Sequence, residues 1–331
     1  MRVRRNAVTQ AFLHDYSPLR IYMYDPDRWP DSALNVLARV LIDPARRRSG
    51  HWYLFEPCAN WRTADLFLHP ADVNFYEGRE PEAVERLEYF ADHPDRHIFV
   101  DHRDCDLPFG GEKSIHLKVS LRHSAANSRI FAIPYLEAVD DFRWYIADPE
   151  PATFDLCFIG QETPFRSRLL TALSEHTQAS WLELTGRFFH GPMLSRLAHN
   201  HGEKPFDPGE KEVLRKRYLE IMRRSRFSLA PRGFGLNSFR FFESLSLGIP
   251  PILVSSDCAL PFAEAVDYSQ FCFCVPAEVE TALPAIIDIL RNTSAAQRNA
   301  MAVAARSAYD NFLSAHVFPL LLYRQLSRLL R

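Results

Sequence analysis

The 331-residue sequence lacks long apolar runs and the cysteine patterns of zinc-binding or disulfide-rich proteins. No segment approaches the ~18 uninterrupted apolar residues of a membrane-spanning helix. Residues 1–19 are basic but hold no apolar stretch of the kind that a signal peptide needs. The six cysteines form no Cys-x-x-Cys pair and no zinc-finger spacing with histidine. We therefore expect a soluble chain whose cysteines are structural thiols in a reducing compartment.

An excess of positive charge is also missing. Lys and Arg number 39 against 41 Asp and Glu, a formal net charge of −2. Since proteins that bind duplex nucleic acid usually carry a basic surplus, this balance argues against nucleic acid as a partner. A local basic pocket that binds a small anion is still compatible with this nearly neutral net charge. The apolar fraction of 47% supplies material for two cores, and the length corresponds to roughly two domains.

Short β-rich runs alternate with helical periodicities along the chain, which is typical of an α/β fold with parallel sheets. An acidic, proline-bearing stretch at residues 147–152 interrupts the alternation, which resumes at Phe154. We therefore predict one α/β domain over residues 1–150 and a second from residue 151 onward. Residues 317–330 mix Leu and Arg, which suits a helix packed on its own protein or one lying on a membrane surface. Candidate strands lie at residues 20–24, 52–55, 65–69, 97–100, 115–119 and 130–133, and then at 154–159, 181–184, 227–230, 252–254 and 271–275.

Residues 226–262 carry the pattern with the clearest chemistry: a predicted strand, a glycine-bearing loop, a helix and a second strand. The two glycines of the loop, including Gly233, allow the backbone to approach a ligand, and Arg232 can bind a phosphate through two hydrogen bonds. Asn237 or Ser238 is a natural residue to begin the helix, whose free N–H groups and dipole favour anions. The segment contains neither a Walker loop nor a GxGxxG fingerprint.

Arg240 and Glu243 lie three residues apart and therefore share a face of the predicted helix. A carboxylate just behind a phosphate-binding helix start is placed to accept hydrogen bonds from the hydroxyls of a ribose. The segment thus predicts a nucleoside-diphosphate site. The residues leave one alternative open, in which Arg240 and Glu243 form a surface ion pair and the glycines only turn the chain.

The same segment strongly resembles the exostosin domain of glycosyltransferase family 47. The resemblance rests on its Pro-Arg-Gly loop, its Ser-Phe-Arg-Phe-x-Glu helix start, a proline-bearing strand and a Leu-Pro-Phe element. Weaker similarity extends over most of the chain, at residues 21–25, 64–70, 97–100, 132–134 and 160–168.

The resemblance implies a GT-B architecture, in which two Rossmann-like domains face each other across a cleft and the C-terminal helices return to the first domain. In such a protein the nucleotide sugar binds the C-terminal domain and the acceptor binds the N-terminal one. The expected ranges are residues 1–150 for the acceptor side, 151–310 for the nucleotide-sugar side and 311–331 for the returning helix.

Position by position, the resemblance assigns Arg232 to the diphosphate and Glu243 to the ribose. Arg166 or Arg168 would approach the diphosphate from the neighbouring loop, which begins at Gly160. The remaining residues of the expected nucleotide-sugar site, which would shape the loop and the helix start, are Gly233, Asn237, Ser238 and Arg240.

The family also implies inversion at the anomeric carbon, which requires a general base for the acceptor hydroxyl. Ligands of open α/β sheets bind at the carboxyl ends of the strands, where the first domain carries several ionisable side chains. Such residues are also common as caps, turn formers or packed side chains, and that alternative stays open. The base candidates are Asp25, His69, Asp101, His102 and Asp104, with the run at residues 101–104 the richest.

Two Asp-x-Asp patterns, at residues 25–27 and 104–106, match the way other glycosyltransferases hold a metal. So short a pattern is weak in a chain with 41 acidic residues. Since arginines and a helix dipole can neutralise a diphosphate, we predict no metal, and no cofactor beyond the sugar nucleotide as co-substrate. His199 and His201 are expected to lie in a solvated loop.

The leading prediction is an inverting glycosyltransferase in polysaccharide synthesis. It would move a sugar from a nucleoside-diphosphate sugar, with UDP the expected nucleotide, to a glycan or lipid-linked acceptor. No membrane anchor is visible, so we expect a cytoplasmic protein with peripheral contact to the inner membrane face. The alternative is a non-catalytic GT-B module that binds a glycan or stabilises a partner enzyme. A third and weaker hypothesis is a sugar-nucleotide epimerase with the GT-B fold.

Overall fold

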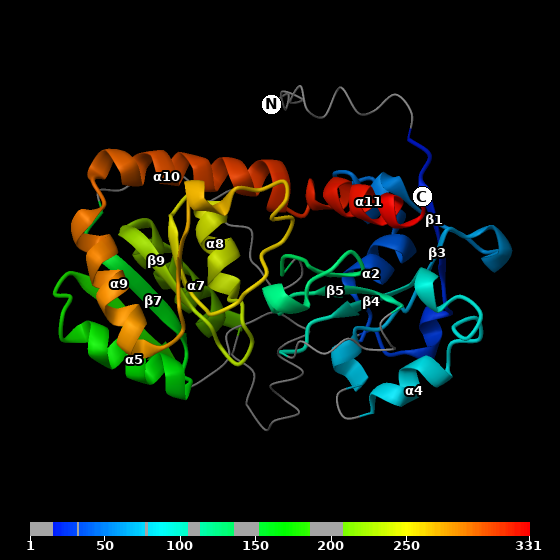
Figure 1. Cartoon of the computed structure of the whole chain (residues 1–331), viewed down its shortest axis with the longest axis horizontal. Helices are drawn as coiled ribbons and strands as arrows, with labels where there is room; N and C mark the ends of the chain where they lie inside the picture. Colours follow the sequence, from blue (N-terminus) through cyan, green and yellow to red (C-terminus); the bar gives the residue numbers. More distant parts are fainter. Residues whose placement is uncertain (1–15, 32, 77–78, 105–112, 136–151, 186–207) are drawn as a thin grey trace.

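The computed structural model describes residues 16–31, 33–76, 79–104, 113–135, 152–185 and 208–331. Two parallel β-sheets lie side by side, each flanked by helices (Figure 1). The predicted α/β class with parallel sheets is therefore confirmed. The boundary proposed at residue 150 lies outside the described residues, so the division of the chain there stays a prediction.

The first sheet is built from six short strands. Every residue of the last four strands is buried, as expected of parallel strands that are covered on both faces. The strand predicted at residues 52–55 begins only at Phe55, because residues 52–54 form a 3-10 turn. The strands are β1 (Leu19–Met23), β2 (Phe55–Pro57), β3 (Leu66–Leu68), β4 (His97–Asp101), β5 (Ile115–Lys118) and β6 (Ile130–Ala132), in the order β2-β1-β3-β4-β5-β6.

Among the described residues of the first half of the chain, the α-helices are short: α2 (Val36–Ile42), α3 (Pro44–Arg47) and α4 (Glu80–Glu85). The first of them begins after Asn35, whose Oδ1 accepts a 3.0 Å hydrogen bond from the Ala38 N–H. That side-chain cap satisfies one of the free N–H groups that begin every helix. Its apolar residues, Leu37 among them, then pack against the sheet.

The second sheet has five parallel strands. Gly248 ends the central helix, α8, with a φ of 70°, a left-handed conformation that glycine adopts without strain. The strands are β7 (Phe154–Gln161), β8 (Ser180–Thr185), β9 (Ser225–Pro231), β10 (Pro251–Val254) and β11 (Phe273–Val275), in the order β11-β10-β9-β7-β8. The helices are α5 (Pro164–Ser174), α7 (Pro208–Arg223), α8 (Phe239–Leu247), α9 (Val279–Asn292) and α10 (Ala295–Ala308).

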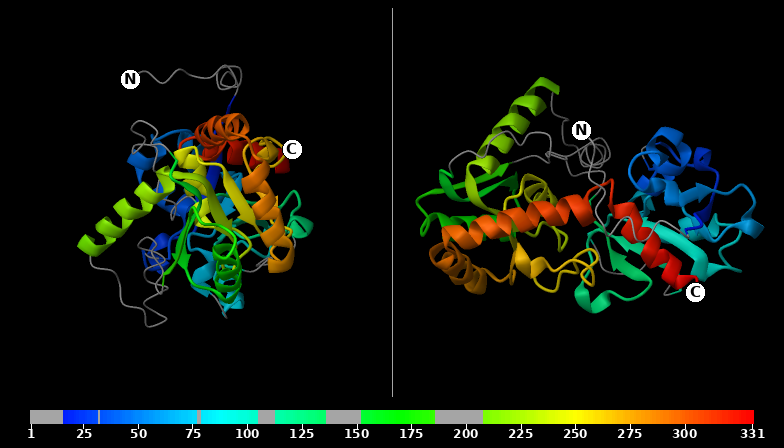
Figure 2. Two further views of the ribbon diagram at one scale, coloured as in Figure 1. Left: turned by 90° about the vertical axis from the view of Figure 1, so that its left-hand side faces the viewer. Right: turned by 90° about the horizontal axis from the view of Figure 1, so that it is seen from above.

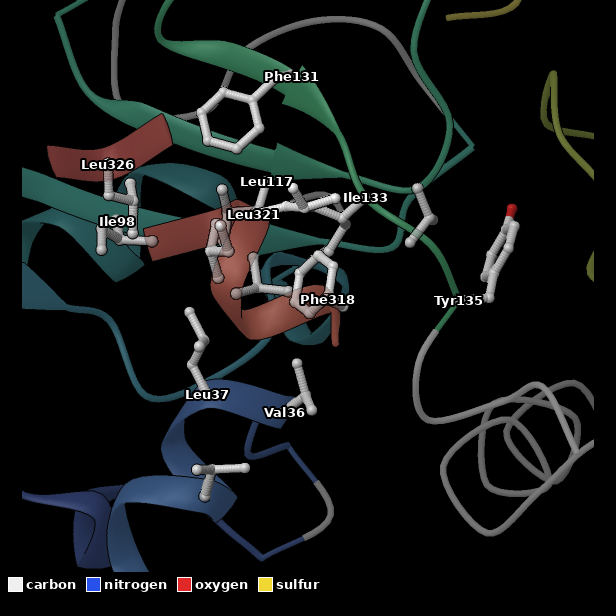
Figure 3. Close-up of a cluster of buried hydrophobic side chains, with 14 of the residues drawn as sticks. Val36, Leu37, Ile98, Leu117, Phe131, Ile133, Tyr135, Phe318, Leu321 and Leu326 are labelled. Carbon is white, nitrogen blue, oxygen red and sulfur yellow. The ribbon is translucent and has the colours of Figure 1, made fainter. Parts of the chain in front are cut away.

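The last helix, α11 (Phe318–Leu329), returns to the first sheet (Figure 2). Phe318 and Leu321 lie in the same buried cluster as Leu37 and Leu117 (Figure 3). The amphipathic segment predicted at the C-terminus is therefore a helix packed on its own protein, and the expected return of the C-terminal helices is confirmed. Within the described ranges, no helix combines the length and the apolar character that crossing a bilayer requires.

The carboxyl edges of the two sheets meet. Ser120 follows β5, and its Oγ accepts a 3.0 Å hydrogen bond from the N–H of Leu236, which lies in the loop between β9 and α8. A second contact joins Arg122 to Cys258 as an antiparallel bridge. Because residues just beyond the strand ends form both contacts, side chains at the two edges can reach the same small region.

Candidate nucleotide-sugar site

The segment at residues 226–262 folds as the sequence predicts, with β9, a loop, α8 and β10 in succession. Ser238 precedes α8 with extended backbone angles, and its N–H donates a 2.8 Å hydrogen bond to Asn237 Oδ1. Gly233 lies beside Arg166, because a Cβ at this glycine would be 3.3 Å from the arginine Nη2. The loop therefore brings the start of α8 and an arginine of α5 together at the carboxyl edge of the second sheet.

Arg240 lies on the first turn of α8 and is buried rather than exposed. Only 8% of its surface is accessible, and its guanidinium stacks 4.3 Å from the ring centroid of Phe158 and 5.4 Å from that of Tyr218. Gly160, in β7, leaves room for this group, since a Cβ there would be 3.1 Å from Arg240 Nη1. A surface ion pair between Arg240 and Glu243 is therefore the wrong interpretation, because Glu243 is only 4% exposed as well.

Arg166, on the first turn of α5, has a guanidinium that binds three backbone carbonyls. Its Nη1 donates to Gln161 at 2.9 Å, its Nη2 to Pro231 at 3.1 Å and its Nε to Arg232 at 3.2 Å. Burial and the nearby charge of Arg240 lower the pKa of Arg166 to about 10, although Asp104 acts in the opposite sense. Arginine stays protonated at that value, so the positive charges of the half-buried Arg166 and the buried Arg240 repel each other here. An anion bound between them would relieve the repulsion.

Several buried nitrogen atoms at this edge have no hydrogen-bond partner within the part of the chain that the structure describes. They are the Nε atoms of Arg232 and Arg240 and the Nδ2 of Asn237. Arg232 is half-buried, and its guanidinium lies 5.7 Å from the ring centroid of Phe165. Buried donors are almost always satisfied in folded proteins, so such a group of donors favours a ligand rich in acceptors.

Glu243 lies one turn further into α8. Its Oε2 accepts a 2.6 Å hydrogen bond from the hydroxyl of Tyr218, a residue of α7. Burial, opposed by the charge of Arg240, holds the pKa of Tyr218 well above its usual range, so the tyrosine is the donor. Sequence analysis missed Tyr218, because a tyrosine in the apolar stripe of a helix looks like any other core residue.

Arg168 is exposed and pairs with a residue of another helix. Its side chain is 67% exposed and forms a 2.9 Å ion pair with Glu280 on α9. The sequence predicted that either Arg166 or Arg168 approaches the diphosphate. Of these two, the structure places only Arg166 against the Pro231–Gly233 backbone. Residues two apart along a helix point to different faces, so the structure favours Arg166 over Arg168 as the phosphate contact, and the assignment stays a prediction.

Asp101 is likewise corrected as a base candidate. It is completely buried, and its carboxylate binds Arg103 through hydrogen bonds of 3.0 Å and also binds Lys118. Hydrogen bonds from Arg103 and the charge of Lys118 outweigh burial and hold the pKa of Asp101 below its usual range. A carboxylate stabilised in this way by two cations is a poor proton acceptor, so the structure argues against Asp101 as the base.

Two further base candidates are held in local structure. Asp25 is exposed and caps a 3-10 turn, with its Oδ1 accepting a 3.0 Å hydrogen bond from the Asp27 N–H. His69 is buried, its Nδ1 lies 2.9 Å from the Ala71 carbonyl oxygen, and burial lowers the pKa of its ring to about 4. Asp25 thus acts as a cap and His69 is a packed side chain, which are the alternatives that the sequence analysis left open for these base candidates.

His102 and Asp104 lie where the two sheets meet. His102 Nδ1 is hydrogen-bonded to Asp72, an aspartate that follows β3 and that sequence analysis missed. It could have been found, since it lies just beyond a predicted strand end, as the other candidates do. Asp104 lies against Gly235 in the loop before α8, where a Cβ would overlap its carboxylate.

Metal binding and the remaining histidines complete the sequence predictions. Within the described ranges, no three His, Cys, Asp or Glu side chains gather closely enough to hold a metal ion. Asp106, His199 and His201 lie outside those ranges. Metal independence therefore stays a prediction. The five cysteines that the structure describes are free thiols.

Two parallel α/β sheets whose carboxyl edges meet, with a last helix that returns to the first sheet, define the GT-B class of proteins. The model of the exostosin GT47 domain matches residues 16–292, which is most of the chain. The chain therefore belongs to the exostosin GT47 family, a family of glycosyltransferases. The resemblance seen in the sequence is confirmed.

Curated relatives share parts of this domain. The Exostosin-1 homolog of Caenorhabditis elegans is 34% identical over 102 residues, which cover 31% of this chain and 26% of that protein. Exostosin-1 of Drosophila melanogaster is 37% identical over 81 residues, which cover 24% of this chain and 10% of that protein. The aligned region thus spans about a quarter of the first relative and a tenth of the second.

Solved structures with a similar layout are more distant in sequence. A glycosyltransferase from Rickettsia africae is 11% identical, with a TM-score of 0.44 over 95% of this chain and 100% of that one. WaaG, a glycosyltransferase involved in lipopolysaccharide biosynthesis, is 13% identical, with a TM-score of 0.44 over 93% of this chain and 99% of that one.

Proposed function

We propose that the protein is an inverting glycosyltransferase that transfers a sugar from a UDP-sugar to a glycan or lipid-linked acceptor in polysaccharide synthesis. The observation that carries this proposal is the arginine group at the carboxyl edge of the second sheet. Arg166 is half-buried and Arg240 is buried, and their charges lie close enough to repel each other. Arg232 and Arg240 each keep a buried Nε without a partner among the described residues. A diphosphate supplies two negative charges and many acceptor atoms to one such group.

In this proposal the arginines act mainly on the leaving group. As the bond from the anomeric carbon to the diphosphate oxygen breaks, negative charge develops on the nucleoside diphosphate. Guanidinium groups that are already fixed in place, together with the N–H groups at the start of α8, stabilise that charge without rearrangement. No metal is needed for this neutralisation, and we propose that none is required.

Glu243 is proposed to bind the ribose. One of its oxygens accepts from Tyr218 at 2.6 Å, and a carboxylate has capacity for further donors. Ribose hydroxyls are such donors, and they lie a short distance from the diphosphate in every nucleoside diphosphate. The acceptor would bind the first domain, whose strand ends contact the loop before α8. We propose that the reaction takes place in the cytoplasm, with peripheral contact to the membrane face.

A thermal-shift panel tests the donor first. UDP-, GDP- and dTDP-sugars are each added to the purified full chain, and a ligand at about 100 times its Kd should stabilise the fold by about 2.7 kcal/mol. UDP-sugars are expected to raise the Tm most. Release of UDP is then measured with and without oligosaccharide acceptors. Stabilisation by UDP without any release would point to the non-catalytic module instead, and no stabilisation by any nucleotide sugar would remove the proposed site.

A further inference from the structure

Two side chains at the carboxyl edge of the first sheet form a hydrogen-bonded pair outside the nucleotide site. His102 follows β4 and Asp72 follows β3, and these two strands are parallel neighbours. Asp72 Oδ2 is hydrogen-bonded to His102 Nδ1, and Asp72 Oδ1 accepts from the His102 backbone N–H at 3.3 Å. The two side chains are only 5% and 3% exposed. A carboxylate that binds both the ring and the backbone of one histidine fixes the orientation of that ring.

The pairing also determines which ring nitrogen can accept a proton. An ionised carboxylate only accepts hydrogen bonds, so Nδ1 of His102 carries the proton that Asp72 binds. Nε2 is then the basic nitrogen of the neutral ring. When Nε2 takes up a proton, the resulting imidazolium lies beside a carboxylate that stabilises it.

The pair lies next to the nucleotide-sugar site. The ring centroid of His102 is 6.3 Å from that of Tyr135, which is in turn 4.0 Å from that of Phe239, the first residue of α8. Two residues beyond His102, Asp104 lies against Gly235 in the loop before α8. Tyr135 therefore links His102 to Phe239, at the helix start where the diphosphate is proposed to bind.

We propose that His102 is the general base of the transfer reaction and that Asp72 is its positioning residue, an inference that rests on the proposed function. His102 Nε2 takes the proton of the acceptor hydroxyl while the hydroxyl oxygen forms a bond to the anomeric carbon. The bond from that carbon to the diphosphate oxygen breaks, and UDP leaves with the electron pair. The imidazolium then returns its proton to solvent.

Among the described residues, the following charged and titratable groups lie around His102 and bear on the expected pH dependence. Asp72 faces it from the segment after β3, and Tyr135 from the segment after β6. Its chain neighbours are Arg103, whose guanidinium binds Asp101, and Asp104. Since Asp72 stabilises the imidazolium, the substitution Asp72→Asn should lower the pKa of His102. A weaker base also transfers the proton less effectively, so the plateau rate should fall as well.

The test compares the variants His102→Ala, His102→Gln and Asp72→Asn with the wild type and with His176→Ala, which changes an exposed histidine far from the sheet edge. UDP release is followed with the UDP-sugar that most stabilises the wild type, with water and with oligosaccharides as acceptors. UDP affinity is measured by calorimetry. We expect UDP release to fall by about 100-fold or more in both His102 variants, with UDP affinity within about threefold of wild type. Asp72→Asn should release UDP about tenfold more slowly and move the acidic limb of kcat/KM to lower pH.

Three outcomes would overturn the proposal. Unchanged UDP release in either His102 variant would remove the histidine as the base. Loss of UDP affinity in parallel with UDP release, in both His102→Ala and His102→Gln, would show a structural role. An acidic limb that stays in place in Asp72→Asn would remove the positioning role. If the wild type itself releases no UDP from any UDP-sugar, the proposed function fails, which is a distinct result.

Discussion

At the scale of single residues, the group formed by Arg166, Arg232 and the buried Arg240 is the most informative feature of the molecule. A charge is costly to bury unless it is paired, yet Arg240 is 8% exposed and stacks on aromatic rings. Arg166 uses its donors on backbone carbonyls, which carry no full charge. The positive potential of the group is therefore still available for an anionic ligand.

The substitution Arg232→Ala tests the diphosphate contact. We expect UDP affinity to fall by about 10-fold to 150-fold, since a charge-assisted hydrogen bond contributes about 1.5–3 kcal/mol. The Tm without ligand should change little, because the Nε of Arg232 has no hydrogen-bond partner among the described residues. Calorimetry with UDP and thermal unfolding measure the two effects. Arg168→Ala is the matched control, and an equal loss of UDP affinity there would contradict the assignment.

The substitution Glu243→Gln tests the ribose contact. Glutamine keeps the shape of the side chain but loses its charge, so we expect a loss of about 1–3 kcal/mol in UDP affinity. Since Tyr218 can still donate to the remaining oxygen, the fold should stay intact. Calorimetry with UDP and with inorganic diphosphate measures the effect. A ribose contact predicts loss for UDP alone, whereas an equal loss for both would mean that Glu243 acts on the phosphate group.

At the scale of elements, the start of α5 shows how a local motif positions the site. Thr163 precedes the helix, and its Oγ1 accepts a 3.2 Å hydrogen bond from the Arg166 N–H. Leu169 and Leu170 are buried, and Arg166 lies three and four residues before them on the same face. The sequence therefore held a signal in favour of Arg166 over Arg168, since a residue in line with the apolar stripe points toward the sheet.

The substitution Thr163→Ala should act on both stability and binding. Loss of the cap is expected to cost about 1 kcal/mol, or roughly 2–4 °C in Tm. UDP affinity should fall as well, because the capped residue is Arg166 itself. Thermal unfolding and UDP calorimetry check the two effects, and Thr163→Ser, which keeps the hydroxyl, should restore both. A loss of stability without any loss of UDP affinity would argue against α5 as part of the site.

At the scale of the whole molecule, the two sheets are coupled through their carboxyl edges and through α11. The buried core that contains Leu37 and Leu117 of the first half also contains Phe241 of α8 and Phe318 of α11. This shared core holds the two sheets together. Destabilisation of the first sheet should therefore also affect the nucleotide site.

Acid should destabilise the molecule through the first sheet. Burial lowers the pKa of both His69 and His97 to about 4, against about 6.5 for histidine in an unfolded chain. Below pH 6.5 the unfolded state binds more protons than the folded state. The free energy of unfolding therefore decreases as the pH is lowered from 6.5 to about 4. Each of the two histidines should lower the free energy of unfolding by about 2 kcal/mol at pH 5, compared with neutral pH. Urea unfolding between pH 7.5 and 5 measures this loss, and constant stability over that range would contradict it.

The sequence by itself determined the local elements and the chemistry of the segment at residues 226–262. Strand and helix periodicities depend on neighbouring residues, and so do the loop glycines and the helix start at Ser238. These features follow from backbone geometry and solvent exclusion over a few residues. For the same reason the family resemblance is clearest in this segment, where the residues that carry it are close together in the chain.

Only the tertiary structure decided which ionisable residues have partners, because those partners are distant in sequence. Asp101 binds Lys118, and His102 is paired with Asp72. Such pairs depend on the strand order, which places β3 and β5 on either side of β4. In the sequence, Asp101 and His102 are equally plausible bases. In the fold, one is neutralised by cations and the other is oriented by a carboxylate, so a proton acceptor can be chosen between them only once the sheet is assembled.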